Sequence, residues 1–172
     1  MLRQFARFPL LRSRMLDGKA KVWYTESMLG KRIVAFDIGD KRIGVAVTDP
    51  FNEYALPSDT YWRTGNFEED VSALIAIAKE KDAGEIVCGL PVNFDGTESV
   101  QTEKTRRFID AMAKKTTLPI YTEDERFTTM QAHEVQRVGG VKRKKRKNSV
   151  DSIAASYILE NYLASKKYGG HV

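Results

Sequence analysis

The sequence has little of what would build a disulfide framework, a zinc centre or a membrane span. Its single cysteine, Cys88, cannot form an internal disulfide, which is usual for proteins of a reducing compartment such as the cytoplasm. Cys88 lies in an apolar run, so we expect a buried core residue rather than a nucleophile. The two histidines, His133 and His171, have no cysteine or histidine at zinc-ligand spacing. No apolar stretch reaches the roughly 18 residues of a transmembrane helix, so we expect a cytoplasmic protein that does not act at a membrane.

Positive charge is concentrated in two segments of the chain. The formal net charge is +5. One run of consecutive basic residues alone carries more positive charge than the net charge of the whole chain. Four arginines also precede the first acidic residue, Asp17. Basic segments attached to a mildly acidic body suit a polyanionic partner, so we expect the chain to bind nucleic acid. The basic run consists of Lys142, Arg143, Lys144, Lys145, Arg146 and Lys147.

Residues 1–30 show neither a clear helical period nor a clear strand period. Three interpretations remain open for them: a flexible or loosely docked extension, residues upstream of a natural start at Met28, or an arginine-rich organelle address that lacks the usual serine enrichment. We therefore divide the chain into an N-terminal extension (1–30), one domain (31–166) and a C-terminal tail (167–172).

The order of the periodic segments predicts a mixed α/β domain. Three β-rich runs joined by short turns come first, and helices then alternate with strands, which implies a mixed sheet covered by helices. Asn66, followed three residues later by Glu69, predicts a capped helix start, and the basic run is predicted to be a loop. The predicted strands are residues 32–37, 43–48, 54–61, 85–90 and 118–122. The predicted helices are residues 66–81, 100–115, 128–138 and 150–164.

Three separate segments each place an acidic residue at the end of an element. Asp37 closes the first predicted strand of the domain, Asp124 and Glu125 close a later one, and Asp151 opens the last helix. In open α/β sheets, ligands bind beyond the carboxyl ends of the strands. Mg²⁺ takes oxygen ligands from carboxylates and from substrate phosphates, and a pair of such ions can promote phosphodiester cleavage. The acids therefore predict a nuclease that uses Mg²⁺ or Mn²⁺.

Each acid also has a purely structural interpretation. Asp37 could cap the turn that follows it. Asp124 or Glu125 could pair with Arg126 on the surface. Asp151 could be favoured by the dipole of a helix that it opens. The metal-site hypothesis therefore depends on whether the acids converge in the fold.

Several short motifs together resemble one known family. Their order along the chain is similar to that of the YqgF, or RuvX, family of pre-16S rRNA nucleases and Holliday junction resolvase-like proteins. The resemblance covers residues 31–164 and implies an RNase H-like fold, a five-stranded mixed sheet flanked by helices. The motifs are Phe36-Asp37-Ile38-Gly39, Lys41-Arg42-Ile43-Gly44-Val45-Ala46, Gly89-Leu90-Pro91-Val92-Asn93 with Asp95-Gly96-Thr97, Asp124-Glu125-Arg126 with Thr128-Thr129, and Asp151 with Ala154-Ala155.

The resemblance also implies a function, a cytoplasmic nuclease that processes the 5′ end of precursor small-subunit (16S) rRNA in ribosome biogenesis. A Holliday junction resolvase and a non-catalytic RNA-binding assembly factor remain as alternatives. Phosphotransferases of the actin and sugar-kinase type share an Asp-x-Gly turn, but they duplicate the domain and are much longer than this chain. The oligomeric state, monomer or homodimer, is left open.

The same resemblance assigns roles to the acids. It makes Asp37 the first-strand ligand that bridges both metal ions, and Asp151 the ligand of the last helix. Related resolvases carry the middle acid on the strand that corresponds to residues 86–90, but here that strand ends without a carboxylate. We therefore assign the middle ligand to Glu125, with Asp124 as the second choice.

Basic and polar residues near the acids are candidates for substrate binding. Lys41 and Arg42 follow Asp37 and are expected to hold a phosphate, unless they belong to a solvated turn. Asn93 begins a polar loop that could contact the nucleic-acid backbone or simply connect a strand to a helix. Arg126 could fork to a phosphate or brace the acids. The basic run at 142–147 is expected to grip the substrate, its alternative being a generic charged loop.

Overall fold

The computed structural model describes residues 12–16, 20–24, 30–93, 97–125 and 143–167. The chain divides into two units, Met1–Gly30 and Lys31–Val172. In the first unit, β1 (Arg12–Leu16) and β2 (Ala20–Tyr24) form an antiparallel hairpin that the periodicity did not predict. A signal for it was present, because Asp17-Gly18 lies between the two strands and Asp-Gly is a favoured hairpin turn sequence.

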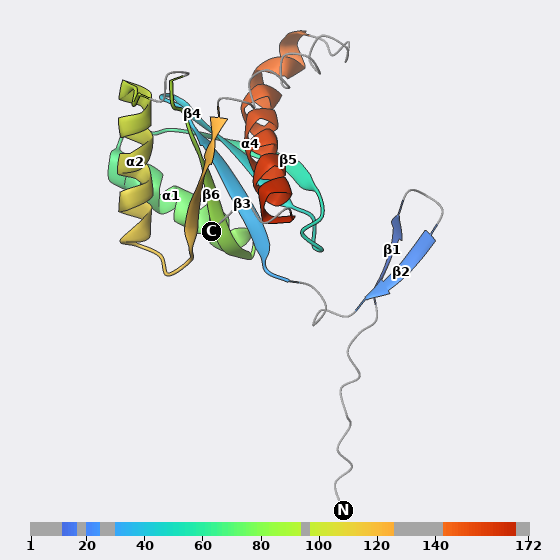
Figure 1. Ribbon diagram of the computed structural model, residues 1–172. Coiled ribbons are helices and arrows are strands. Elements are labelled where there is room, and N and C mark those ends of the chain that lie inside the picture. Colours follow the sequence, from blue (N-terminus) through green and yellow to red (C-terminus); the bar gives the residue numbers. More distant parts are fainter. Residues whose placement is uncertain (1–11, 17–19, 25–29, 94–96, 126–142, 168–172) are drawn as a thin grey trace, which may run out of the picture. The chain divides into compact units, whose positions relative to one another are not determined.

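The second unit is built on a five-stranded mixed sheet with the strand order β5-β4-β3-β6-β7 (Figure 1). Neighbours β3, β4 and β5 are antiparallel, whereas β6 is parallel to both β3 and β7. The predicted mixed sheet is therefore confirmed, and its first three strands form the expected meander. The strands are β3 (Arg32–Ile38), β4 (Arg42–Thr48), β5 (Ala55–Trp62), β6 (Ala83–Leu90) and β7 (Ile120–Asp124).

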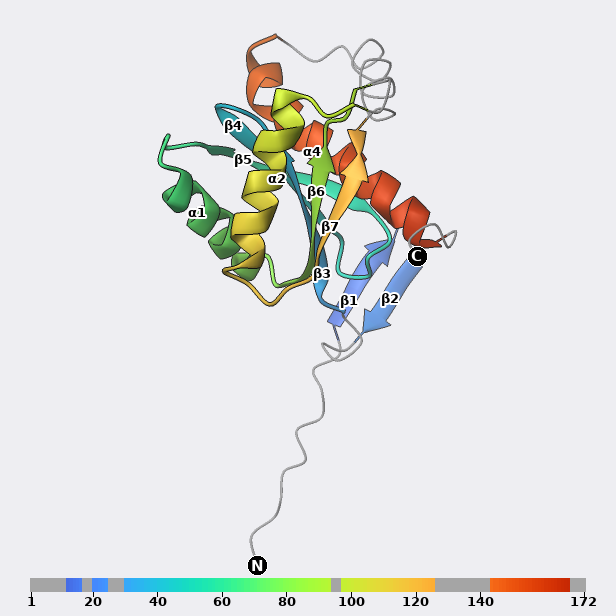
Figure 2. The same ribbon diagram turned by 60° about the vertical axis from the view of Figure 1, so that its left-hand side comes forward.

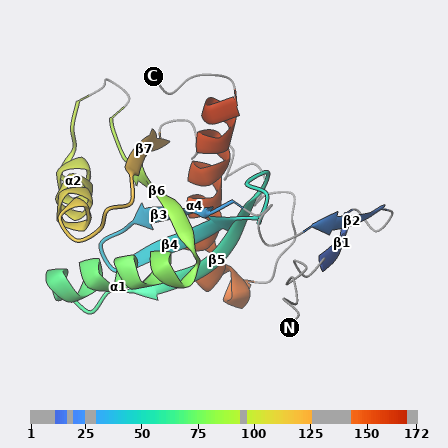
Figure 3. The ribbon, with the colours of Figure 1, turned by 90° about the horizontal axis from the view of Figure 1, so that it is seen from below.

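Helices cover both faces of this sheet. Helices α1 (Phe67–Glu80) and α2 (Val100–Ala113) lie on one face, and α4 (Arg143–Lys167) crosses the other (Figures 2 and 3). Because successive side chains of a strand point to opposite faces, the core forms two layers. Phe36 and Val45 pack toward α1 and α2, whereas Ala35 and Ala46 pack toward Ile158 and its neighbours on α4.

Local signals explain several element boundaries and core positions. The side chain of Asn66 accepts hydrogen bonds from the backbone N–H groups of Glu68 and Glu69, as the predicted cap of α1 should. Asp82, after the end of that helix, adopts a positive φ of 56°. Cys88 is fully buried in the core, as expected, and burial raises the pKa of its thiol to about 12. Among the described helices, none is long and apolar enough to cross a membrane.

The prediction of a basic loop was wrong. Helix α4 begins at Arg143, so Arg143, Lys144, Lys145, Arg146 and Lys147 form its first turns. Lysine and arginine are good helix formers, and no glycine or proline interrupts this segment. Asp151 therefore lies about two turns inside the helix instead of opening it, which removes the helix-dipole interpretation. Lys142 and the helix predicted at 128–138 lie outside the described residues.

Candidate active site

Asp37 lies near the end of β3, on the face of the sheet that α4 covers. Its pairing partner on the neighbouring strand β4 is Gly44. Burial, and secondly the negative charge of Asp151, raise the pKa of Asp37 to about 6. A carboxyl group in this position is therefore poorly compensated, because no cation among its described surroundings offsets the loss of water.

Gly44 lets α4 approach the sheet beside Asp37. A Cβ atom on Gly44 would overlap the backbone carbonyl oxygen of Asp151, so a residue with a side chain here would push the helix away. Asp151 Oδ2 lies 3.2 Å from Arg42 Nε as an ion pair. The same oxygen is buried and accepts no hydrogen bond from the described residues, so this ion pair lacks hydrogen-bond geometry.

Glu125 brings a third carboxylate to the same place. It follows β7 directly, and its Oε1 occupies the space that a side chain at Gly89 of β6 would fill. Burial, then the charges of Asp37 and Asp124, raise the pKa of Glu125 to about 8. Strand β6 itself ends without an acid. The residue that follows the neighbouring strand β7, Glu125, instead places its carboxylate over Gly89 of β6.

The structure thus brings the acids of three distant segments into electrostatic contact at the carboxyl ends of β3 and β7. As the side chains stand, no group of three acids among the described residues encloses a point where a metal ion would sit. The donor set nevertheless fits a divalent cation, because it combines a buried oxygen without a hydrogen bond with two carboxyl groups whose charge is disfavoured. A cation would remove their mutual repulsion.

Comparison with known proteins assigns the chain to a family. The family model described as "RuvX: Holliday junction resolvase" matches residues 31–165. The chain belongs to the RuvX family. Proteins named "Putative pre-16S rRNA nuclease" are 40% identical over 134 residues in Clostridium acetobutylicum (78% of this chain, 98% of the relative) and 40% identical over 153 residues in Rickettsia canadensis (89% and 99%). The resemblance expected from the motifs is therefore confirmed.

A solved structure shares the fold of this RuvX-family chain. It is described as "T. thermophilus RuvC in complex with Holliday junction substrate", and it has a TM-score of 0.54 at 11% sequence identity. The likeness covers 81% of this chain and 97% of the RuvC chain. It confirms the RNase H-like fold with its five-stranded mixed sheet.

The candidate substrate-binding residues differ in their exposure and in their contacts with the acids. Arg42 is half-buried beside the acids and also lies over the Trp62 ring, 5.3 Å from its centroid. Lys41 is exposed in the β3–β4 turn. The Asn93 side chain donates to Thr97 Oγ1 at 2.9 Å across its loop. Arg126 and Lys142 lie outside the described residues. The basic residues at 143–147 belong to α4, and their side chains are not among those described.

A buried acid outside the metal-site candidates was missed by the sequence reasoning. Asp70, in the first turn of α1, is 0% exposed and accepts from Arg63 Nε at 3.0 Å. Arg63 also donates to the carbonyl oxygen of Gly39 at 3.2 Å. This pair therefore braces the turn that follows Asp37. A signal existed, because Asp70 stands three residues after Phe67 and directly before Val71, on the apolar stripe of the helix, where an acid must find partners.

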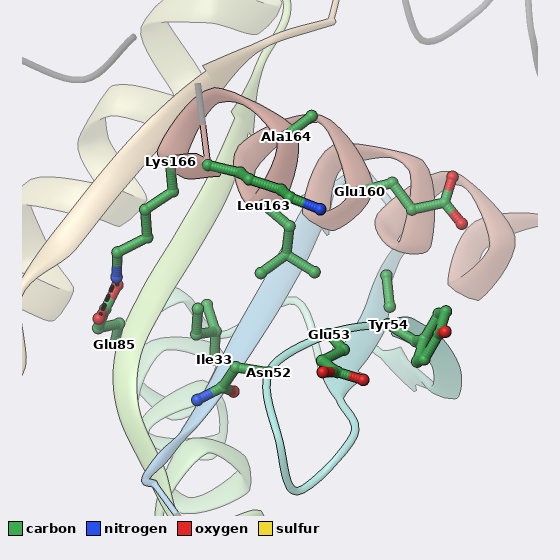
Figure 4. Close-up of a pocket in the computed structure, with 11 residues that line it drawn as sticks. Ile33, Asn52, Glu53, Tyr54, Glu85, Glu160, Leu163, Ala164 and Lys166 are labelled. Carbon is green, nitrogen blue, oxygen red and sulfur yellow. Dashed lines mark hydrogen bonds and ion pairs between the residues drawn. The ribbon is translucent and has the colours of Figure 1, made fainter. Parts of the chain in front are cut away.

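A hollow on the α4 face lies away from the acids. It is lined by Ile33 at the start of β3, by the β4–β5 connection and by the last turns of α4 (Figure 4). On its rim, Glu85 accepts from Lys166 Nζ at 2.7 Å and from the Tyr162 hydroxyl at 2.8 Å. None of the predicted site residues lines it, and Asp37 lies toward the other end of β3.

Proposed function

We propose that this chain is a divalent-metal-dependent nuclease that hydrolyses phosphodiester bonds in structured nucleic acid, with the 5′ region of precursor 16S rRNA as its cytoplasmic substrate. The observation that carries the proposal is the convergence of Asp37, Glu125 and Asp151 from three segments onto one end of the sheet. Precursor 16S rRNA is taken from the name of the relatives with about 40% identity, and its 5′ region from the family resemblance of the motifs.

Asp37, Glu125 and Asp151 would hold Mg²⁺ or Mn²⁺, with Asp124 beside Glu125 as a further carboxylate. When bound, such ions activate a water molecule and stabilise the leaving oxygen of the cleaved phosphodiester. Glu125 would have to lose a proton to serve as a ligand at neutral pH, because the pKa of this group is raised to about 8.

Other residues of the chain would position the acids and the substrate. Arg42 restrains the Asp151 carboxylate through their ion pair. Arg63 holds the turn after Asp37 through its bond to the Gly39 carbonyl. Lys41 and the basic first turns of α4 would neutralise backbone phosphates, which raises affinity without reading the base sequence.

A four-way DNA junction is the second candidate substrate. The family description favours it, and so does the fold shared with a RuvC that was solved with such a junction. The acids serve either substrate equally well. A non-catalytic RNA-binding factor explains the site less well, because half-buried, mutually repelling carboxylates are unfavourable for folding and do not help to bind a polyanion.

The test is cleavage of a precursor 16S rRNA fragment and of a four-way DNA junction, with Mg²⁺ or Mn²⁺ added and with both removed. Wild type is compared with Asp151→Asn and Glu125→Gln. The matched control is Glu160→Gln, an exposed acid further along α4 that lines the hollow instead of the site. We expect metal-dependent cleavage that both site variants abolish and the control retains.

The two substrates separate the outcomes. Cleavage of the RNA alone supports the rRNA assignment, and cleavage of the junction alone moves the function to a resolvase. Cleavage that survives in both site variants would mean that these acids are not the catalytic ones. Binding of RNA without cleavage by the wild type would leave an RNA-binding factor.

A further inference from the structure

Trp62 is an exposed aromatic side chain at the edge of the candidate active site. It is the last residue of β5, which forms one edge of the five-stranded sheet. Its side chain is 58% exposed. Its partner in the strand pairing is Arg42 of β4, so the two side chains leave the same face of the sheet. Trp62 is thereby fixed next to a residue that touches the acids.

Two contacts, both made by Arg42, join the Trp62 ring to the Asp151 carboxylate. The guanidinium carbon of Arg42 lies 5.3 Å from the centre of the ring, which is within the range of a cation–π interaction. Arg42 Nε lies 3.2 Å from Asp151 Oδ2. One arginine therefore restrains the indole and the carboxylate together, while more than half of the Trp62 side chain still faces solvent.

Exposure alone would not single out Trp62, since isolated apolar side chains are common on protein surfaces. Two other aromatic side chains among the described residues are exposed, and they provide a comparison. Tyr54, 63% exposed, lines the hollow near the start of β5, away from the acids. Tyr121 has a ring partner, since its centroid lies 5.5 Å from that of Tyr162. Of the three, Trp62 combines an open ring surface with a link, through Arg42, to the candidate metal ligand Asp151.

We propose that Trp62 and Arg42 form a stacking platform for an unpaired base next to the cleaved phosphate. Bases of single-stranded nucleic acid stack on aromatic side chains whatever their sequence, because every base has a π face. Proteins also recognise RNA mostly through unpaired nucleotides, since the grooves of paired RNA are hard to read. The inference rests on the proposed nuclease function and defines its substrate class, a site with at least one unpaired nucleotide beside the scissile bond.

Binding is measured first, through the fluorescence of Trp62 itself. The chain has two tryptophans, so Trp23→Phe leaves Trp62 as the sole reporter. This variant is titrated, without added metal, with a short single-stranded oligoribonucleotide and with the same sugar-phosphate backbone carrying abasic positions. We expect the bases to quench the fluorescence and the abasic strand to leave it unchanged. Equal quenching by both strands, or none by either, would overturn the platform.

Cleavage is measured second, on a precursor rRNA fragment and on the same fragment made abasic beside the scissile phosphate. Trp62→Ala should lower kcat/KM on the intact fragment about 5- to 150-fold, the range of one base–aromatic stack. Trp62→Phe should keep most of the activity, and Tyr54→Ala, an exposed aromatic residue directly before the same strand, is the matched control. On the abasic fragment, Trp62→Ala should bring no further loss.

The outcomes distinguish this platform from the nuclease assignment. If wild type cleaves and Trp62→Ala cleaves equally well, or loses as much on the abasic fragment, the platform is wrong and the nuclease stands. If wild type cleaves nothing but bases alone quench Trp62, the platform stands and the nuclease is wrong. A change of oligomeric state in Trp62→Ala, seen by light scattering, would make this edge a contact between copies and overturn the platform.

Discussion

Asp37, half-buried near the end of β3, and Asp70, fully buried in α1, are both withdrawn from solvent, but their surroundings differ in kind. Burial alone would raise the pKa of Asp70, yet hydrogen bonds from Thr64, Arg63 and Tyr61 outweigh it and hold the pKa below its usual value. Around Asp37, burial and the charge of Asp151 act together and raise the pKa to about 6. This fold can satisfy a buried acid fully. Asp37 has no such partners among the described residues, and it lies where we propose that a divalent cation binds.

The two acids are also mechanically connected. Arg63 pairs with Asp70 at 3.0 Å and donates to the Gly39 carbonyl, in the turn directly after the Asp37 strand. Its backbone N–H donates to the Lys41 carbonyl in the same turn. Gln101 of α2 adds a bond of 2.8 Å to the carbonyl of Ile38. The satisfied acid thus stabilises the frame on which the unsatisfied one is held.

The largest effect that we expect from changing either aspartate is the loss of catalytic activity in Asp37→Asn. Asp37 is a proposed metal ligand, and its loss would remove several kcal/mol of transition-state stabilisation, so activity should fall about a thousandfold. The metal-free protein should unfold at a higher temperature, because the variant removes a charge that burial disfavours. Cleavage rates and thermal unfolding in EDTA measure the two effects. Asp40→Asn, an exposed acid of the same turn, is the control, and a destabilised Asp37→Asn protein would contradict the contrast.

Asp70→Asn should show the opposite pattern, a large loss of stability. The substitution leaves the partly buried Arg63 without its counter-charge, which is unfavourable by about 3–5 kcal/mol in buried pairs. Urea unfolding in EDTA measures the change. Asp59→Asn is the matched control, since Asp59 is an exposed acid paired with Lys81, and surface pairs contribute about 0–1 kcal/mol. If Asp70→Asn unfolds like this control, the Asp70 cluster is not what stabilises the turn.

The hydrophobic and turn patterns were sufficient to predict the sheet strands, the first two helices and the position of Asp37 near the end of a strand. They failed where a lysine- and arginine-rich run had helical propensity but no apolar stripe, so α4 was predicted to begin seven residues too late. They also could not show how Glu125 reaches the site. That depends on the parallel pairing of β6 with β7, which places Glu125 over Gly89, and such pairing is set by contacts far apart in the sequence.

The roles of Gly44 and Gly89 show the same limit. In the sequence, each is one glycine in a β-rich run, which indicates at most a bulge or a close approach of backbone. Only the packed structure shows that α4 approaches the first and that a carboxylate occupies the space over the second. The convergence of the acids thus depends on glycine at these two positions, because a side chain at either would occupy the space that Asp151 or Glu125 needs.

The smallest expected effect is a pH dependence that follows from the same contrast. The pKa of Asp37 rises from 3.8 to about 6 and that of Glu125 from 4.5 to about 8, so the folded, metal-free protein binds these protons more tightly than the unfolded chain. Its stability should therefore fall by a few kcal/mol as the pH rises from 4.5 to 8. Asp70 acts with the opposite sign. Because the pKa of Asp70 is lowered in the folded protein, the stability that this carboxylate contributes is lost only when the pH falls into the acid range.

Urea unfolding in EDTA at several pH values between 4.5 and 8 measures this slope. The double variant Asp37→Asn, Glu125→Gln should flatten it, because both protonation differences between folded and unfolded chains are removed. Mg²⁺ should restore stability to the wild type at pH 8 in proportion to the logarithm of its concentration above the dissociation constant, and should not restore it to the double variant. A wild-type protein whose stability is the same at pH 5 and pH 8 without metal would mean that water or a neighbouring cation already compensates these acids, and the case for a metal at this end of the sheet would lose its electrostatic basis.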